Sequence, residues 1–192
     1  MTRADPIAAL ERFAGTRAAI ILALAWGFAE AIAFPVVPDV LLGIFALAAP
    51  RRAVPVFLAA VGGALVGSVV LAALAAADPA AIRGLLLTLP GIHVGMLDDA
   101  ARATASGDPL ALALFGPGTP LKVYTAAWIA GAGSVPGLLL AIAINRVTRI
   151  VPGVATLAIA GIVAPGWVRR HGRAVTLGYA AFWIGLYAWY WA

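Results

Sequence analysis

Two stretches of the sequence decide the fold: Glu30-Ala-Ile-Ala-Phe-Pro-Val-Val-Pro-Asp39 and Phe115-Gly-Pro-Gly-Thr-Pro-Leu-Lys122. Each stretch joins two apolar runs through two prolines, and each carries ionisable side chains in apolar surroundings. Charges and unpaired backbone groups are costly within a membrane unless protein or a water-filled cavity surrounds them. A pair of such interrupted segments is typical of a transporter binding site. We therefore expect two re-entrant interrupted helices whose charged side chains gather in one pocket.

The composition indicates a polytopic membrane protein. Of the 192 residues, 64% are hydrophobic and 11% are charged, whereas soluble domains are roughly 45–50% apolar and about 25% charged. Cysteine is absent and the two histidines stand far apart, so we expect no disulfides, no metal centre and no cofactor. The net charge of +5 comes largely from arginines scattered in short loops, so we expect no nucleic-acid partner.

The apolar runs predict a single all-α membrane domain over residues 18–192. Residues 1–17 mix charged and apolar side chains and predict an N-terminal amphipathic interfacial helix. The run that ends before Pro35 is followed by a second run, residues 40–49, of only ten residues. Ten helical residues are too few to cross about 30 Å of hydrocarbon. A re-entrant hairpin near 18–49 therefore fits better than two transmembrane helices.

A second re-entrant hairpin is expected near 109–133, and it packs among about three to four transmembrane helices. The clearest of these covers residues 54–77, where Gly62-Gly63 and Gly67-Ser68 predict a face for close helix packing. Other apolar runs predict helices at 135–165, with a kink at Pro152, and at 174–190. Residues 80–108 mix charges with leucines, so an amphipathic helix and a tilted span both stay open.

The distribution of charge supports two re-entrant hairpins. They would place eight cationic side chains on one side of the membrane: Arg3, Arg12, Arg17, Arg51, Arg52, Arg169, Arg170 and Arg173. The opposite side would hold two arginines and four aspartates: Arg83, Arg102, Asp78, Asp98, Asp99 and Asp108. The positive-inside rule favours such a difference between the two sides.

The second interrupted stretch predicts an anion site. Thr119 followed by Pro120 is typical of a helix start, with a hydroxyl N-cap and proline at the first helical position. Gly116 and Gly118 permit a tight turn. Lys122 would lie in the first helical turn, where a cation is unfavourable unless an anion is also bound. Free N–H groups beside an ammonium group favour the binding of phosphate. The alternative interpretation is a Pro/Gly loop without an anion site, whose lysine extends to water.

Two carboxylates and two arginines complete the candidate site. Glu30 lies within an apolar run, where burial favours the protonated form of a carboxyl group unless a cation is near, and a proton-coupling residue needs such an environment. Asp39 is the second proton-coupling candidate, although it could instead cap the helix that follows Pro38. Arg146 and Arg149, three residues apart, share one helix face. They could bind phosphate, pair with the two carboxylates, or contact lipid headgroups at the interface.

These residues resemble the signatures of the DedA family, also called SNARE-associated or VTT-domain membrane proteins. The first signature is Glu30 followed by Phe34-Pro-Val-Val-Pro-Asp39. The second is Gly116-Pro-Gly-Thr-Pro-Leu-Lys122, which runs on to Ala130-Gly131. The resemblance covers roughly residues 18–165. It departs from the family pattern in two respects: an arginine before the proline is absent, and Lys122 stands where a second arginine is common.

The resemblance implies a multi-pass protein of the bacterial inner membrane that translocates a phosphate-bearing lipid such as undecaprenyl phosphate or a phospholipid, coupled to protons. We therefore predict a flippase-like protein rather than an enzyme, since no nucleophile has a recognisable setting. Its partners would be membrane lipids and protons, and the sequence does not decide whether the protein forms a homo-oligomer. Two other functions also stay open: a non-transporting membrane scaffold or homeostasis factor, and a carrier of small ions or solutes.

Overall fold

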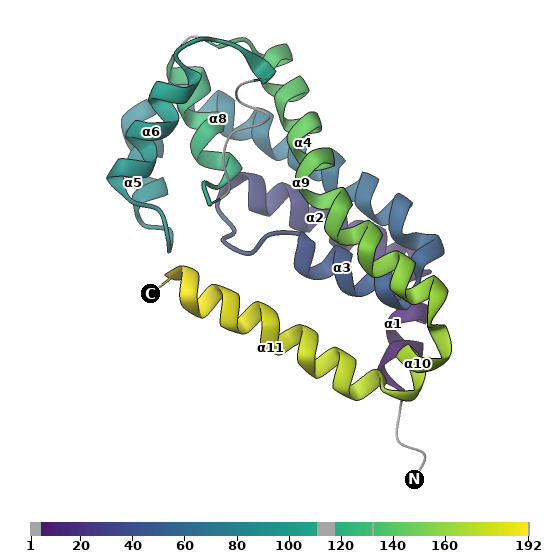
Figure 1. Ribbon diagram of the computed structural model, residues 1–192. Helices are drawn as coiled ribbons and strands as arrows, with labels where there is room; N and C mark the ends of the chain where they lie inside the picture. Colours follow the sequence, from purple (N-terminus) through teal and green to yellow (C-terminus); the bar gives the residue numbers. More distant parts are fainter. Residues whose placement is uncertain (1–4, 111–117, 132, 192) are drawn as a thin grey trace.

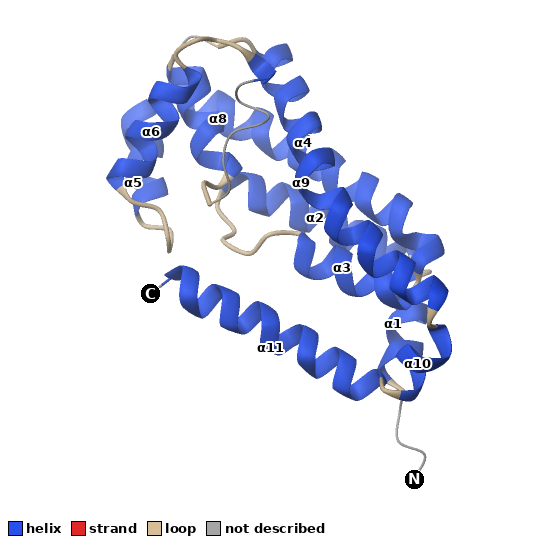
Figure 2. Cartoon of the chain, in the orientation of Figure 1, coloured by secondary structure: helices blue, strands red, loops and turns tan. Residues whose placement is uncertain are grey.

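The computed structural model describes residues 5–110, 118–131 and 133–191, and all of the elements in these ranges are helical (Figure 2). The helices, in chain order, are α1 (Pro6–Ala14), α2 (Arg17–Ile32), α3 (Asp39–Ala48), the 3-10 helix η1 (Pro50–Arg52), α4 (Ala53–Ala77), α5 (Pro79–Leu87), α6 (Val94–Thr104), α8 (Leu121–Ala130), α9 (Val135–Val163), α10 (Pro165–Arg170) and α11 (Gly172–Trp191). The all-α prediction is confirmed for the described part of the chain.

Two helix pairs form the centre of the molecule, since α2 packs along α4 and α3 packs along α9 (Figure 1). The short helices α5, α6 and α8 cover one end of this bundle, and α1 and α10 cover the other end. Helix α11 runs along one side. Both members of the first pair are rich in alanine and glycine, so their backbones can approach closely.

The contact between α2 and α4 depends on glycines from both helices. A Cβ atom at Gly63 would lie 1.9 Å from the carbonyl oxygen of Leu24, and one at Gly27 would lie 2.0 Å from that of Ala60. Gly67 is similarly close to Phe28. Gly62, which the sequence grouped with these glycines, has no other atom within 4 Å of its would-be Cβ and takes no part in the contact. A helix face is set by spacing of three and four residues, so adjacent glycines cannot share it.

Two helical segments, Pro50–Ala77 and Val135–Val163, are long and apolar enough to cross a membrane among the residues described. They include two of the predicted spans. The predicted span at 174–190 corresponds to α11, whose glycines, tyrosines and tryptophans lower its mean hydropathy, so it does not meet the same criterion. Membrane association is thus supported by two helices, fewer than the three to four expected.

The first interrupted stretch separates α2, of 16 residues, from α3, of ten. Neither helix reaches the roughly 20 residues that a bilayer crossing requires, so the hairpin near 18–49 stays a prediction that these lengths allow. The hairpin near 109–133 is described only in part. Residues 111–117, which include Gly116, lie outside the described residues, and the description resumes at Gly118.

Residues 80–108 form two short helices, α5 and α6, of nine and 11 residues. Each helix has a side-chain N-cap, Asp78 for α5 and His93 for α6. Arg83 of α5 reaches Asp98 of α6 at 3.5 Å. Because neither helix reaches the length that a bilayer crossing requires, this region forms two short helices rather than one tilted transmembrane helix.

The basic segments gather at one end of the bundle. The Arg51-Arg52 turn, α1 and α10 lie at the end opposite to α5 and α6 (Figure 1). Arg169 of α10 donates to the carboxylate of Glu11 in α1 at 2.8 Å. This placement agrees with the distribution of charge that the sequence predicts for the two sides of a membrane.

Replacing Gly63 with alanine is expected to lower the free energy of unfolding by about 1–3 kcal/mol, because the added methyl group forces α2 and α4 apart. The adjacent Gly62→Ala variant is the matched control. It adds a methyl group where no other atom lies nearby, and alanine favours the helix by up to about 1 kcal/mol. Thermal unfolding in detergent measures both variants, and an equal loss of stability in the two would contradict this packing.

Candidate functional site

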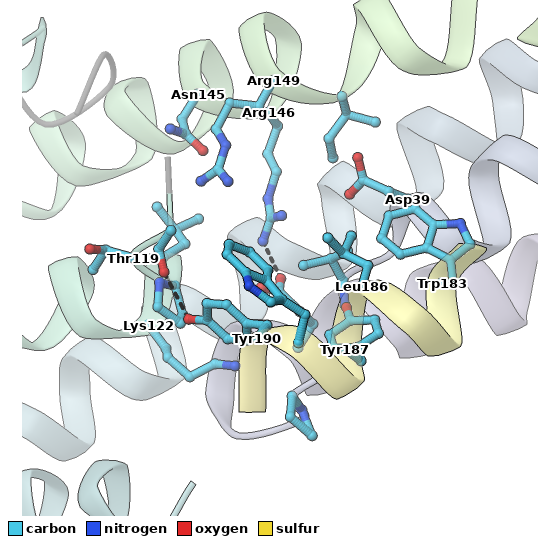
Figure 3. A pocket seen from close by; sticks show the side chains of 18 residues that line it. Asp39, Thr119, Lys122, Asn145, Arg146, Arg149, Trp183, Leu186, Tyr187 and Tyr190 are labelled. Atoms are coloured by element: carbon cyan, nitrogen blue, oxygen red, sulfur yellow. Dashed lines mark hydrogen bonds and ion pairs between the residues drawn. The ribbon is translucent and has the colours of Figure 1, made fainter. Parts of the chain in front are cut away.

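A cavity of about 400 Å³ lies where the two interrupted stretches meet α9 and α11 (Figure 3). All of the residues predicted for substrate binding and proton coupling line it: Glu30, Asp39, Gly118, Thr119, Lys122, Arg146 and Arg149. Five aromatic and aliphatic side chains of α11 form another part of its wall: Trp183, Leu186, Tyr187, Trp189 and Tyr190. The structure therefore brings the predicted residues together, while their roles stay predictions.

Side chains from distant parts of the sequence bond the main chain of the first interrupted stretch. The Lys122 ammonium donates to the carbonyl oxygen of Phe34 at 2.9 Å. The indole N–H of Trp26 donates to Val36 O at 2.9 Å, and the hydroxyl of Tyr187 accepts from Val37 N at 2.7 Å. These bonds replace the helical partners that the prolines remove, so an interrupted backbone can exist in apolar surroundings.

Glu30 and Arg146, which both line the cavity, form a buried ion pair. The two residues are only 3% and 6% exposed, and the arginine donates through one terminal nitrogen. The Nε of Arg146 is also buried, and it has no hydrogen-bond partner among the described residues. A buried donor without an acceptor is costly, so an acceptor from a ligand would be stabilised at this position.

The cationic side chains outnumber the carboxylates around the cavity. Three cations, Lys122, Arg146 and Arg149, face two carboxylates, Glu30 and Asp39. Lys122 is 2% exposed, and its ammonium bonds a main-chain carbonyl rather than a carboxylate. Arg149 is exposed and forms no ion pair within the described ranges. Its guanidinium extends from α9 toward the cavity beside that of Arg146 (Figure 3), and so is available to an anion.

The start of α8 differs from the sequence prediction in one respect. Pro120, not Thr119, is the N-cap residue, and no side-chain hydrogen bond caps the helix. The extended conformation of Pro120 lets Leu121 begin the helix, so the Thr119 N-cap prediction is wrong. Lys122 does lie in the first turn, as predicted. Gly118 has φ +105, a conformation that glycine adopts without steric cost.

Asp39 is the first residue of α3, and the N-cap position is occupied by Pro38, so Asp39 is not the N-cap residue. The carboxylate stands in the first turn of the helix, and it also lines the cavity with the two arginines of α9. A carboxylate in the first turn also interacts favourably with the helix dipole. Asp39 thus faces the same space as Glu30 while lacking the direct ion pair that Glu30 has.

The sequence predicts residues 174–190 only as a transmembrane helix, so the contribution of α11 to the cavity is not among its predictions. Tyr179 donates to the carbonyl oxygens of Asp39 and Val40, both at 3.0 Å. Tyr190 donates to Gly118 O at 2.8 Å. Together with Tyr187, these residues are spaced by eight and three positions, which places them on one helix face. This spacing of hydroxyl-bearing aromatics was the signal available in the sequence.

Replacing Arg146 with leucine is expected to lower the free energy of unfolding by about 3–5 kcal/mol, because Glu30 is then buried without a cation. The double variant Glu30→Gln with Arg146→Leu should lose less than Arg146→Leu alone. Arg169→Leu removes the exposed pair with Glu11 and should cost at most about 1 kcal/mol. Unfolding in detergent measures all three variants. A double variant less stable than Arg146→Leu would rule out this coupling.

Among the described residues, no group of three His, Asp or Glu side chains comes together in a way that could hold a metal ion. Comparison of the chain with family models, with curated proteins and with solved structures finds no match. The resemblance to the DedA family therefore stays a prediction carried by its two motifs. The cavity and its charged lining are the observations from which a function can be proposed.

Proposed function

We propose that the protein is a membrane translocase that moves a phosphate-bearing lipid, such as a polyprenyl phosphate or a phospholipid, in a step coupled to protons. The observation that carries this proposal is the lining of the cavity, where three cationic side chains stand beside two carboxylates. Of the cations, Arg149 lacks an ion pair within the described residues, and Arg146 has a buried Nε–H without a hydrogen-bond acceptor. Phosphate oxygens match guanidinium donors in charge and geometry. The resemblance to DedA proteins supports the same assignment.

The ion pair between Glu30 and Arg146 suggests how binding and protonation would be coupled. A phosphate near Arg149 and the Nε of Arg146 would compete with the Glu30 carboxylate for the same guanidinium. Protonation of Glu30 would weaken its hold on Arg146 and so favour phosphate. Departure of the lipid would restore the pair and release the proton. Asp39, which also lines the cavity, would assist by the same means.

Replacing Arg149 with alanine is expected to reduce lipid translocation by at least about tenfold, because a charge-assisted hydrogen bond to phosphate contributes roughly 1.5–3 kcal/mol. Lys122→Ala should also reduce the rate, through loss of its bond to the first interrupted stretch. Arg83→Ala, in the exposed pair with Asp98, is the control. Liposomes with a fluorescent polyprenyl phosphate or phosphatidic acid give the rates. Equal rates in all of these variants would refute the phosphate site.

Replacing Glu30 with glutamine is expected to remove the dependence of translocation on a pH gradient, because the amide cannot exchange a proton. Parallel liposomes with and without an imposed gradient provide the measurement, and Glu11→Gln, at an exposed ion pair, is the matched control. If the Glu30→Gln protein responds to the gradient as the unaltered protein does, Glu30 is not the coupling residue.

The same liposomes distinguish the two other functions. A scaffold or homeostasis factor would move no lipid, and its variants would differ only in stability. A carrier of small ions or solutes would take up a soluble anion such as inorganic phosphate without moving any lipid. The lipid translocase is favoured because the wall that α11 adds to the cavity is aromatic and aliphatic, a surface suited to a hydrocarbon chain.

A further inference from the structure

We propose that α11 is a lateral gate of the cavity, held closed by the hydroxyl groups of Tyr179, Tyr187 and Tyr190, which we call the gate tyrosines. This inference rests on the proposed function, because it names the route by which a lipid would reach the site. The chain has four tyrosines, and three of them are gate tyrosines. Their partners are main-chain atoms of both interrupted stretches.

The packing of α11 differs from that of the other long helices. Within α11, all of whose residues the structure describes, only Gly172 is buried. Helices α4 and α9, in contrast, bury residues along much of their length. Because apolar burial is the main term that fixes a helix in a fold, the middle and the end of α11 depend on a few polar bonds. Such an element is suited to open and close.

The two ends of α11 are held differently. At its first residue, a Cβ on Gly172 would lie 3.0 Å from Ile7 Cγ1 and 3.1 Å from Asp5 Oδ1, so this end is packed against α1. At the far end, Tyr190 reaches Gly118, and its ring lies against Gly91 in the α5–α6 connection. A movement about the packed end near Gly172 would therefore separate the gate tyrosines from the interrupted stretches.

Such a movement would open the cavity toward the outer side of α11. Five α11 residues line the cavity, whereas α2, α3, α8 and α9 hold one another in the bundle. The exposed apolar residues of α11 include Leu177, Phe182 and Ile184, which suit contact with lipid chains. An opening on this side would admit an amphiphile from the membrane, with its phosphate toward Arg149 and its hydrocarbon chain beside α11.

Thiol labelling tests the gate without requiring transport. Ile150 lines the cavity from α9 and is buried, and the chain has no native cysteine. In nanodiscs, an Ile150→Cys protein should react slowly with N-ethylmaleimide. Adding Tyr187→Phe and Tyr190→Phe, which removes two hydroxyl bonds, should speed labelling by about tenfold. Leu177→Ala, on the exposed surface of α11, should leave the labelling rate unchanged. Unchanged labelling in the double Phe variant would overturn the gate.

A reversible tether tests the gate in transport. Cysteines at Val37 and Tyr187, joined by a short reducible bis-thiosulfonate, would hold α11 against the first stretch, whose main chain Tyr187 already bonds. The tether should lower lipid translocation by at least tenfold, and reduction of the same sample should restore it. The control tether joins cysteines at Glu11 and Arg169, which meet at the far end, and should have no effect. Unimpaired translocation by the tethered protein would also overturn the gate.

The two tests separate failure of the gate from failure of the proposed function. If thiol labelling responds to the gate tyrosines but the unaltered protein moves no lipid, the gate stands and the translocase proposal fails. If the protein moves lipid while neither the tether nor the tyrosine substitutions has an effect, the translocase stands and the gate fails.

Discussion

The structure depends on how an interrupted helix satisfies its main chain in apolar surroundings. Because of the prolines between Glu30 and Asp39, α2 ends at Ile32 and α3 begins only at Asp39. The carbonyl and N–H groups between the two helices lack helical partners and need other ones. The partners include Lys122, Trp26 and Tyr187. Two of these residues, Lys122 and Tyr187, also line the cavity, so the bonds that stabilise the interrupted backbone also help to assemble the site.

The balance of charge in the cavity follows from the same bonds. The hydrogen-bond partner of Lys122 is an uncharged carbonyl oxygen, whereas Arg146 is paired with the carboxylate of Glu30. The cavity therefore keeps an excess of cation over carboxylate, even though it lies against apolar walls. Buried charges without full compensation are unfavourable. A bound anion would relieve this, which is the physical basis for assigning a phosphate-bearing ligand to the cavity.

The interrupted stretches and the charged residues that line the cavity could be predicted from the sequence, because proline, glycine and isolated charges in an apolar run are local signals. Sequence reasoning placed Glu30 and Arg146 in one pocket, although their pairing was only one of several alternatives. It missed the part played by α11, since the spacing of the tyrosines indicates a shared helix face but does not identify the main chain, as far as 150 residues away, that this face contacts. It also assigned the N-cap of α8 to Thr119, where the backbone conformation of Pro120 decides the helix start.

The position of the gate tyrosines near the end of the chain has a consequence for biogenesis. The Tyr187 hydroxyl bonds the main chain of the first interrupted stretch, although the two are 150 residues apart in the sequence. The ribosome therefore synthesises this stretch long before Tyr187, because synthesis proceeds from the N-terminus at about 5–20 residues per second. For several seconds the main chain at Val37 must rely on water, lipid headgroups or the insertion machinery. Maturation of the pocket therefore coincides with the arrival of α11, and any nascent chain that stops before α11 carries an unfinished site.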